Sequence, residues 1–515
     1  MSWEKEIGEL RQRQALAQAM GGEDKIARQH RAGRLTVRER IEALLDPGSF
    51  REIGSISGVA GYDEAGALAT FTPTNFVFGR GRVEQRPVVV AGDDFTVRGG
   101  ASDASIIEKL VAAEQMAHEL RLPMVRLVEG SGGGGSVKSL EALGYTYVPY
   151  LPGWEFMVRN LSTLPVVSLG LGPIAGFGAA KTVASHYSVL VRGQAQMFVA
   201  GPPVVAAAGQ KLTKEELGSS RIHAGNGAID DEVASEHDAF ERARRFLSYL
   251  PASVHELAAR GACADDPGRR EEFLVSAVPR DRREVYRMRP ILEAVVDGGS
   301  FFEVGRLHGR SVITALARLD GWPVAVVASD PFVMGGLWTA ASSAKLERFV
   351  SFAETFHLPV VHFVDNPGFM IGKQAEQEGT IRAGVRALTA VYQATVPWCT
   401  ILVRKAFGVA GAGHQNHTRF HYRYAWPSGD WGSLPIEGGI EAAYKAELDA
   451  APDRAARAAE IAERLNRVRS PFRSAERFQI EEIIDPRETR GVLCEFANLA
   501  APLRTAGPVA FGYRP

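Results

Sequence analysis

The sequence has few cysteines, no long apolar run and no excess of charge of one sign. Its cysteines, Cys263, Cys399 and Cys494, are far apart, which excludes a disulfide framework and a cysteine-based metal site. No apolar run approaches the roughly 18 residues of a membrane span, and the charged start lacks the apolar core of a signal peptide. With a net charge of −1, no nucleic-acid or membrane partner is expected. We expect a cytoplasmic protein, or its equivalent in the mitochondrial matrix.

The usual catalytic motifs are also missing. The sequence has no HExxH pair, no GxSxG turn and no prominent pair of carboxylates. His414, His417 and His421 are spaced i, i+3 and i+7, which places them on one face of an expected helix and suggests zinc. However, residues i and i+7 lie about 10 Å apart along a helix axis, too far to share one ion. We therefore expect no bound metal, and the role of these histidines stays open between packing and lining a pocket.

The chain contains the same passage twice. RVEQRPVVVAGDDFTVRGG at 82–100 recurs as RLDGWPVAVVASDPFVMGG at 318–336, a shift of 236 residues. Upstream, IEALLDPGSFREIG at 41–54 matches LEAVVDGGSFFEVG at 292–305 with a shift of 251, so the first copy holds 15 extra residues between these blocks. Ordered matches with small insertions indicate a duplicated module, and we expect the functional site where two such modules meet.

Length and periodicity agree with two α/β domains. A chain of 515 residues exceeds what one hydrophobic core usually supports, and the least patterned stretch, 251–285, suggests domains at 1–258 and 259–515. Short apolar runs alternate with helical patterns, which favours parallel strand connections. The predicted strands are 88–92, 123–130 and 165–172, and the predicted helices are 35–45 with Thr36 as its cap, 101–120 with Ile107, Leu110, Val111 and Ala117 on one side, and 440–470.

The last strand of each copy runs into a glycine-rich turn followed by a predicted helix. The two passages are GPIAGFGAAKTVASHY at 172–187 and KAFGVAGAGHQNHTRFHY at 405–422. Small residues let the backbone approach a ligand, and a helix start has unpaired N–H groups. Such turns can form oxyanion holes from main chain alone, although close helix–strand packing also explains one of them. Their presence at matching places in both copies favours the oxyanion holes.

Two nucleotide-binding interpretations fit less well. GSGGGG at 130–135 matches the dinucleotide pattern, but Glu155, at the required distance, lies in an expected helix start rather than at a strand end. The matching loop of the second copy, DNPGFMIG at 365–372, has no such pattern. A phosphate-binding loop needs glycine before Lys181, where Ala180 stands. We favour neither interpretation.

Ordered motifs across nearly the whole chain resemble the carboxyltransferase beta subunits of biotin-dependent acyl-CoA carboxylases of the propionyl-, methylcrotonyl- and geranyl-CoA type. The motifs are RQHRAGRLTVRERIEALLDPGSF, DDFTVRGG, FVAGPPVV and EELGSSRIH in the first half, and VDNPGFMIG, AWPSG and IIDPRETR in the second. The resemblance implies an α/β fold of two tandem crotonase-like (ClpP/crotonase-type) domains arising from internal duplication. It also implies a homo-hexamer whose sites combine the first half of one subunit with the second half of another.

The resemblance further implies the reaction and its residues. Carboxybiotin supplies CO2, the biotin nitrogen removes the acyl-CoA α-proton, and the enolate attacks the CO2. The backbone amides of Gly176 and Phe177 would bind the thioester oxygen, and those of Val409 and Ala410 the biotin ureido oxygen. Residues expected to line the acyl-CoA and biotin sites are Gly132, Gly133, Gly134, Gly135, Gly408, Gly411 and Ala412.

Several positions depart from the family pattern. Phe177 and Val409 each replace a usual glycine, and GSGGGGSVKS replaces the Gly-Ala-Arg-Ile loop of propionyl-type relatives. Ala412 stands where short-chain members have an acidic residue. We therefore expect acyl groups longer or more branched than propionyl to be accepted at least as well as propionyl, while the acyl group itself stays open.

A partner is expected because the chain lacks a Met-Lys-Met biotinylation site and an ATP-grasp domain. The partner would be an alpha subunit with biotin carboxylase and biotin carrier domains. Two alternatives remain: the carboxyltransferase subunit of a biotin-dependent acyl-CoA decarboxylase, and a non-catalytic scaffold homologue whose oxyanion holes have decayed. Phe177 and Val409 are the residues that favour the scaffold.

Overall fold

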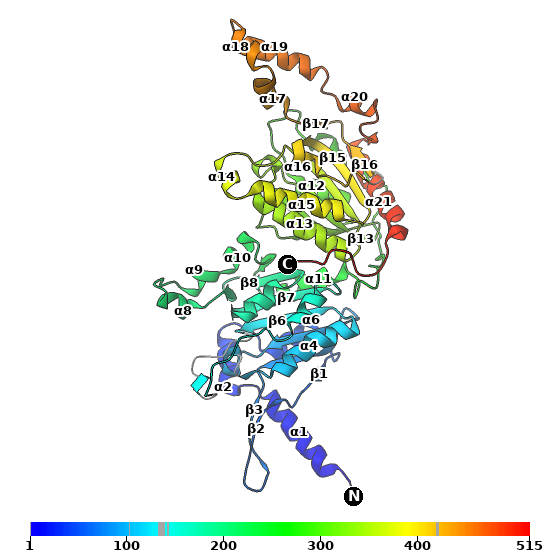
Figure 1. The fold of residues 1–515 in the computed structure, drawn as a ribbon. Coiled ribbons are helices and arrows are strands. Elements are labelled where there is room, and N and C mark those ends of the chain that lie inside the picture. The colour runs from blue at the N-terminus through cyan, green and yellow to red at the C-terminus, as the bar shows by residue number, and fades with distance from the viewer. Residues whose placement is uncertain (1, 102–103, 132–139, 142–143, 419–421) are drawn as a thin grey trace. The chain divides into compact units, whose positions relative to one another are not determined.

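The chain forms two compact units in the computed structural model. The structure describes residues 2–101, 104–131, 140–141, 144–418 and 422–515. Unit 1 comprises residues 1–256 with 514–515, and unit 2 comprises residues 257–513 (Figure 1). Each unit has its own sheet and its own hydrophobic core, so each is described by itself.

Among the described residues, unit 1 is built on an eight-stranded mixed sheet of order β1-β4-β5-β6-β7-β8-β10, with β9 beside β7. The pairs β1–β4 and β4–β5 are antiparallel, and every later pair is parallel. The strands are β1 (Arg51–Ile53), β4 (Phe76–Val83), β5 (Arg86–Asp93), β6 (Met124–Gly130), β7 (Val166–Ala175), β8 (Tyr187–Val191), β9 (Gln196–Phe198) and β10 (Asp231–Val233). The helices are α1 (Glu4–Gln18), α2 (Glu23–Arg31), α3 (Val37–Leu44), α4 (Ile107–Leu120), α6 (Trp154–Asn160), α7 (Phe177–Val183), α8 (Pro202–Ala207), α9 (Lys214–Gly218), α10 (Ser220–Asn226) and α11 (Glu236–Ser248).

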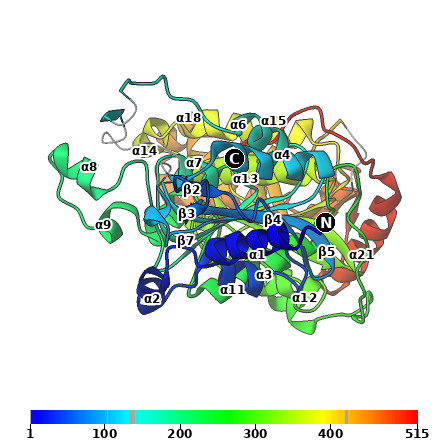
Figure 2. The ribbon, with the colours of Figure 1, turned by 90° about the horizontal axis from the view of Figure 1, so that it is seen from below.

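Helices cover both faces of this sheet. The helices α4 and α6 lie on one face, and α3 and α11 lie on the other (Figure 2). The central strands β6 and β8 are buried along their whole length, as expected for strands covered on both sides. Leu110, Ala113 and Ala117 of α4 pack on Phe78 and Val89 of the sheet. Burying a side chain such as Leu110 contributes about 1.5–3 kcal/mol, so this layer holds the strand ends in place.

Unit 2 repeats this topology strand for strand. Its order is β11-β12-β13-β14-β15-β16-β18, with β17 beside β15, and its first two pairs are again antiparallel. The strands are β11 (Phe302–Val304), β12 (Val312–Leu319), β13 (Trp322–Ser329), β14 (Val360–Asn366), β15 (Trp398–Phe407), β16 (Tyr422–Ala425), β17 (Asp430–Gly432) and β18 (Glu482–Ile483). The helices are α12 (Met288–Val295), α13 (Ala340–Thr355), α14 (Lys373–Gln377), α15 (Thr380–Gln393), α16 (Gly408–Ala412), α17 (Ile436–Ala443), α18 (Lys445–Ala450), α19 (Arg454–Asn466), α20 (Pro471–Ala475) and α21 (Thr489–Ala500). The predicted internal duplication is confirmed.

The insertion predicted in the first copy is a β-hairpin. The strands β2 (Gly58–Tyr62) and β3 (Leu68–Pro73) pair with each other between β1 and β4, and they form a separate two-stranded sheet. Unit 2 connects the equivalent strands β11 and β12 directly, so the insertion lies outside the shared framework.

Two of the predicted helices differ from the observed ones. Helix α4 begins at Ile107 rather than at 101, because Ile106 is extended, and Ile107 is 39% exposed rather than on the buried side. The segment 440–470 is not one helix: α17 and α18 are separated at Tyr444, whose backbone is not helical, and α19 ends at Asn466. Pro452 separates α18 from α19, because it cannot donate the N–H that a continuous helix requires. The prediction for α3 is confirmed: Thr36 and Glu39 form a capping box.

Candidate active site

The first glycine-rich turn joins β7 to α7 through Gly176. This residue has φ +58° and ψ −122°, a conformation that is open to glycine and strained for any other residue. The N–H of Gly176 donates to the carbonyl of Phe198 at 3.1 Å, and the N–H of Gly178 donates to the carbonyl of Ser131 at 2.9 Å. Among the described residues, no acceptor faces the N–H of Phe177. The amide available at this turn is therefore that of Phe177.

The side chain of Phe177 lies beside charged and aromatic groups. Its ring centroid is 6.2 Å from that of Trp154 and 5.9 Å from Nζ of Lys181. Lys181 is buried, and its Nζ is 3.6 Å from a carboxylate oxygen of Asp93. Phe177, Lys181 and Asp93 line a small cavity of about 20 Å³, which has room for one water molecule. The phenyl ring is therefore packed beneath the turn together with Lys181.

The second glycine-rich turn joins β15 to α16 in the same way. Gly408 has φ +61° and matches Gly176 at the shift of 232 residues. Within the described part of the chain, the N–H groups of Val409 and Ala410 meet no acceptor. The side chain of Val409 is 59% exposed, whereas Ala410 is buried. Unit 2 thus presents two adjacent free amides at this turn.

Short-range packing explains the small residues of the second turn. A Cβ atom added at Gly411 would lie 2.5 Å from the carbonyl carbon of Ala406, which is too close for any side chain. Ala412 is exposed, and its carbonyl is 3.0 Å from Nε2 of His417. The remaining residues expected near a cofactor, Gly132–Gly135, lie outside the described residues, and the predicted acyl preference that depends on them stays a prediction.

The predicted histidine face of a helix is wrong. Helix α16 ends at Ala412, so His414 and His417 lie in the turn that follows it, and His421 is outside the described residues. Burial lowers the pKa of His414 to about 3, and burial likewise lowers the pKa of His362 on β14 to about 4. Both rings are therefore neutral near pH 7. In the part of the chain that the structure describes, no group of three His, Cys, Asp or Glu side chains has the arrangement of a metal site.

Sequence reasoning missed a buried carboxylate at the end of each central strand. Glu129 ends β6 next to the first turn and forms ion pairs with Arg34 and Arg40, each at 2.6 Å. Asp365, near the end of β14, pairs with Arg404 at 2.9 Å and accepts a hydrogen bond from Tyr286. The two carboxylates are related by the 236-residue shift, which is the sequence signal that could have revealed them. Breaking such a buried pair typically costs about 3–5 kcal/mol, so these residues hold the strand ends beneath the turns.

Both turns offer backbone N–H donors, and the charged groups described near the first turn are already paired, Lys181 with Asp93 and Glu129 with Arg34 and Arg40. The amides of Phe177, Val409 and Ala410 can donate to an oxygen that gains negative charge, as in an oxyanion hole. Tandem α/β units with such turns at the carboxyl ends of matching strands define a class of duplicated enzymes that stabilise enolates or related oxyanions.

Comparison with known proteins identifies the family. Residues 28–506 match the carboxyl transferase domain. The chain is 33% identical to the propionyl-CoA carboxylase carboxyltransferase subunit of Haloferax mediterranei, over 99% of this chain and 98% of that protein. It is 33% identical to the methylmalonyl-CoA carboxyltransferase 12S subunit of Propionibacterium freudenreichii subsp. shermanii, over 98% and 95% of the two chains. The crystal structure of the transcarboxylase 12S hexamer with methylmalonyl-coenzyme A and methylmalonic acid bound superposes with a TM-score of 0.88, at 29% identity over 100% of this chain and 98% of that chain.

The chain belongs to the carboxyl transferase domain family. The resemblance noted from the motifs is confirmed, as are the fold of two tandem crotonase-like domains and the assignment to the carboxyltransferase enzymes. Among the described residues, no helix has both the length and the apolar character that crossing a membrane requires.

Proposed function

We propose that the chain is the carboxyltransferase subunit of a biotin-dependent acyl-CoA carboxylase. The observation that carries the proposal is the pair of matching turns, in which a strand is followed by a glycine with positive φ and then by backbone amides that meet no acceptor among the described residues. Family membership supports the reaction class, and the bound methylmalonyl-coenzyme A of the 12S neighbour supports an acyl-CoA substrate.

In unit 1, the amide of Phe177 would donate to the thioester oxygen of the acyl-CoA. That oxygen becomes an enolate oxygen when the α-proton leaves, and a fixed donor lowers the free energy of this charge. Gly176 was expected to supply the second donor, but its N–H is held by the carbonyl of Phe198. It contributes instead the positive φ of the turn that precedes the amide of Phe177.

In unit 2, the amides of Val409 and Ala410 fit the ureido oxygen of biotin, because two adjacent unpaired N–H groups match one carbonyl-type acceptor. When bound, biotin would supply the carboxyl group and a nitrogen base. Val409 and Ala410 would hold the oxygen, and among the described residues the histidines close to this turn, His414 and His362, are neutral and buried. The remaining lining at this turn would come from Gly408, Gly411 and Ala412.

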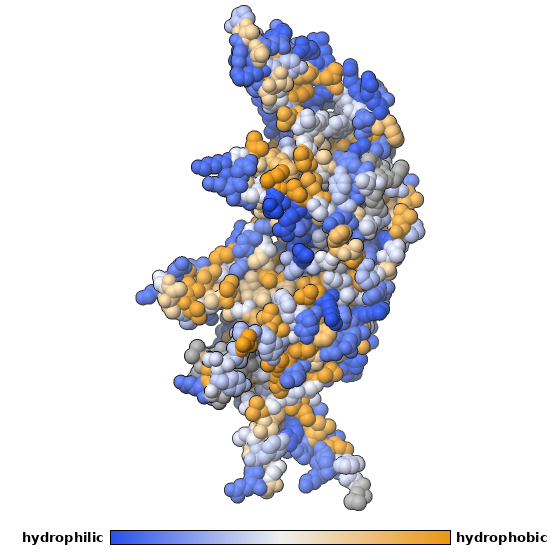
Figure 3. Space-filling model, viewed as in Figure 1, coloured by the Kyte–Doolittle hydropathy of each residue, from blue (hydrophilic) through white to orange (hydrophobic). Residues whose placement is uncertain are grey.

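The proposal also includes a biotin-carrying partner subunit and association of the chain with copies of itself. A biotin carboxylase and carrier subunit would deliver the biotin, and the chain would assemble as a homo-hexamer, by analogy with the hexamer assembly of transcarboxylase 12S. The segment after β9 fits burial against another copy, because Val199 and Val204 are 96% and 62% exposed. Apolar residues also gather over α8 and α9 in Figure 3. Apolar side chains gathered on a surface commonly mark a protein contact.

A decarboxylase remains the second candidate. The chain is 30% identical to the methylmalonyl-CoA decarboxylase subunit alpha of Veillonella parvula, over 98% of each chain. The two enzymes would use the same half-reaction in opposite directions, so the identity of the partner separates them. A scaffold is disfavoured because amides at both turns meet no acceptor in the part of the chain that the structure describes.

The proposal is tested with the purified chain, methylmalonyl-CoA labelled in its free carboxyl group, and free biotin. Transfer of label to biotin, with release of propionyl-CoA, is the expected result. The C–C bond between the α-carbon of methylmalonyl-CoA and its carboxyl group breaks, and an N–C bond forms on biotin. The proton lost from the ureido nitrogen is balanced by the proton gained at the α-carbon of propionyl-CoA. A purified, folded chain that binds CoA esters but transfers no label to biotin would overturn the proposal in favour of a scaffold.

A further inference from the structure

His414 lies two residues after α16, and its backbone carbonyl accepts hydrogen bonds from side chains of two strands. Its carbonyl oxygen accepts hydrogen bonds from Nδ1 of His362 at 3.0 Å, Nε1 of Trp398 at 2.9 Å and Oγ1 of Thr400 at 3.1 Å. His362 belongs to β14, and the other two donors belong to the start of β15. A carbonyl oxygen has two lone pairs, so three donors use its full capacity. The backbone at His414 is therefore fixed to the sheet.

The ring of His414 binds the turn itself. Its Nδ1 lies 2.6 Å from the carbonyl oxygen of Gly411, and because a carbonyl only accepts, Nδ1 carries the hydrogen. This bond satisfies one of the carbonyls left unpaired at the end of α16. The N–H of Gly413 donates to the carbonyl of Ala410 at 3.1 Å. The last residues of α16 are thus bound by the ring of His414 and by the N–H of the preceding residue, Gly413.

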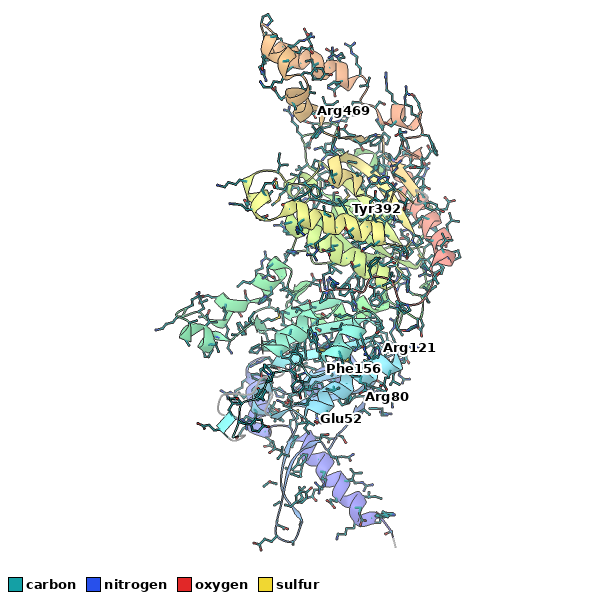
Figure 4. All side chains as sticks on the ribbon, in the orientation of Figure 1. Glu52, Arg80, Arg121, Phe156, Tyr392 and Arg469 are labelled. Carbon is teal, nitrogen blue, oxygen red and sulfur yellow. The ribbon has the colours of Figure 1, made fainter. Side chains whose placement is uncertain are left out.

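Close packing leaves this turn little freedom. A Cβ added at Gly413 would meet the side chain of Leu388 on α15 at 2.5 Å. Further along, the side chain of Asn416 donates to the carbonyl of Tyr392. Tyr392 also belongs to α15 (Figure 4). The start of α16 continues directly from β15, and its end is bound back to the first residues of the same strand through His414. Val409 and Ala410 lie between these two fixed points.

We propose that His414 is a positioning residue that holds the amides of Val409 and Ala410 in place for catalysis. The inference rests on the proposed function of these amides. His414 would act through hydrogen bonds alone: it is 7% exposed, and its Nε2 is buried without a partner among the described residues, so no proton relay starts from it. The structure thereby gives a role to the histidine that the sequence left unexplained.

The test compares His414→Leu with His414→Asn, whose side-chain amide can replace the Nδ1 donor. Turnover is followed as transfer of label from methylmalonyl-CoA to free biotin, and hydrogen exchange is followed over residues 408–413. We expect the leucine variant to lose at least tenfold in turnover. Complete removal of an oxyanion donor costs roughly a hundredfold or more, and a misplaced donor should cost a fraction of that loss. The KM for methylmalonyl-CoA should stay within about twofold, because that substrate would use the amide of unit 1. The asparagine variant should recover most of the turnover.

His357→Leu is the matched control. His357 also lies in unit 2, is also 7% exposed, and also has a ring nitrogen, Nε2, 2.9 Å from a backbone carbonyl, that of Gly507. Because its φ is +55°, leucine should destabilise unit 2 there at least as much as at His414, yet turnover per folded molecule should not change.

Three results would overturn the inference: full turnover in folded His414→Leu, no recovery in His414→Asn, or unchanged exchange over residues 408–413 in the leucine variant. If the wild-type chain transfers no label, the proposed function fails instead. Faster exchange confined to this segment would then still support the structural role of His414.

Discussion

At the scale of single residues, the backbone carries the chemistry proposed for this protein. Phe177 and Val409 stand where the resemblance led us to expect glycines, but a side chain does not remove the N–H. The ring of Phe177 is packed near Trp154 and Lys181, and Val409 points its side chain toward solvent. Both substitutions thus leave the donors intact, which explains how an apparent loss of two glycines is compatible with an oxyanion hole.

Proline at position 177 should distinguish the contribution of the Phe177 amide to turnover from that of its phenyl ring. Phe177 is the first residue of α7, where proline is well tolerated, and Gly176 before it has no Cβ to clash with the proline ring. Phe177→Pro removes only the N–H and the phenyl group, and it should lower turnover about a hundredfold to a thousandfold. Phe177→Ala keeps the N–H and should retain most of the turnover. Equal activity of the two variants in the label-transfer assay would argue against an oxyanion hole at this turn.

Proline at position 410 tests the second turn. Ala410→Pro removes one of the two free amides of α16, and a loss of about a hundredfold or more in turnover is expected. Ala410→Gly keeps the amide and adds no atoms to a buried position, so it should remain active. Circular dichroism must show that both variants are folded, because proline also restricts the residue before it. A folded, fully active proline variant would exclude this amide from catalysis.

At the scale of elements, the contacts between β14, β15 and α16 depend on neutral histidines. His362 and His414 are held below their ordinary pKa by burial, at about 4 and about 3. In the unfolded chain each would titrate near 6.5. The unfolded state therefore binds protons first as the pH falls, so the stability that these groups contribute is fully present above about pH 6.5 and is lost toward pH 4.

This linkage predicts acid sensitivity in unit 2. Lowering the pH from 7.5 to 5 should reduce the free energy of unfolding of unit 2 by about 2 kcal/mol for each of the two histidines. In His414→Asn, which has no titrating group at this position, the loss should shrink by about half. Urea unfolding followed by tryptophan fluorescence at the two pH values measures the effect. Identical pH dependence of variant and wild type would contradict the assigned protonation of His414.

At the scale of the whole molecule, duplication supplies two similar units that differ where their substrates are expected to differ. Unit 1 offers the amide of Phe177, whose side chain lines a small cavity with Asp93 and Lys181, whereas unit 2 offers two adjacent amides on a turn fixed by His414. The shared topology explains why both turns form at the carboxyl end of equivalent strands. The differences lie in loops and helix starts, where the packing of the sheet does not dictate the sequence.

Carboxylation by this chain should depend on a partner. The sequence holds neither a biotinylation motif nor an ATP-grasp domain, so the purified chain should fix no bicarbonate on acyl-CoA with ATP. Addition of a biotinylated carboxylase and carrier subunit should restore ATP-dependent fixation of labelled bicarbonate. The same preparation without ATP is the control, and fixation by the chain alone would contradict the proposed division of labour.

The sequence by itself determined the duplication, the position of both glycine turns, the capping box of α3 and the absence of a conventional acid–base pair. These features are local or periodic, so they can be read from neighbouring residues and from the shifts between the two copies. The helix start at Ile107 and the break at Pro452 were missed because periodic apolar residues continue across an extended residue and a proline.

Only the tertiary structure decided which amides are free. The pairing of β7 with β9 brings the carbonyl of Phe198 to the N–H of Gly176, and the loop after β6 brings that of Ser131 to Gly178. His362 and His414 lie 52 residues apart in the chain, yet adjacent strands bring them into hydrogen-bond contact. A hydrogen bond depends on which groups the sheet register places within about 3 Å, and distant residues of the chain contribute to that choice.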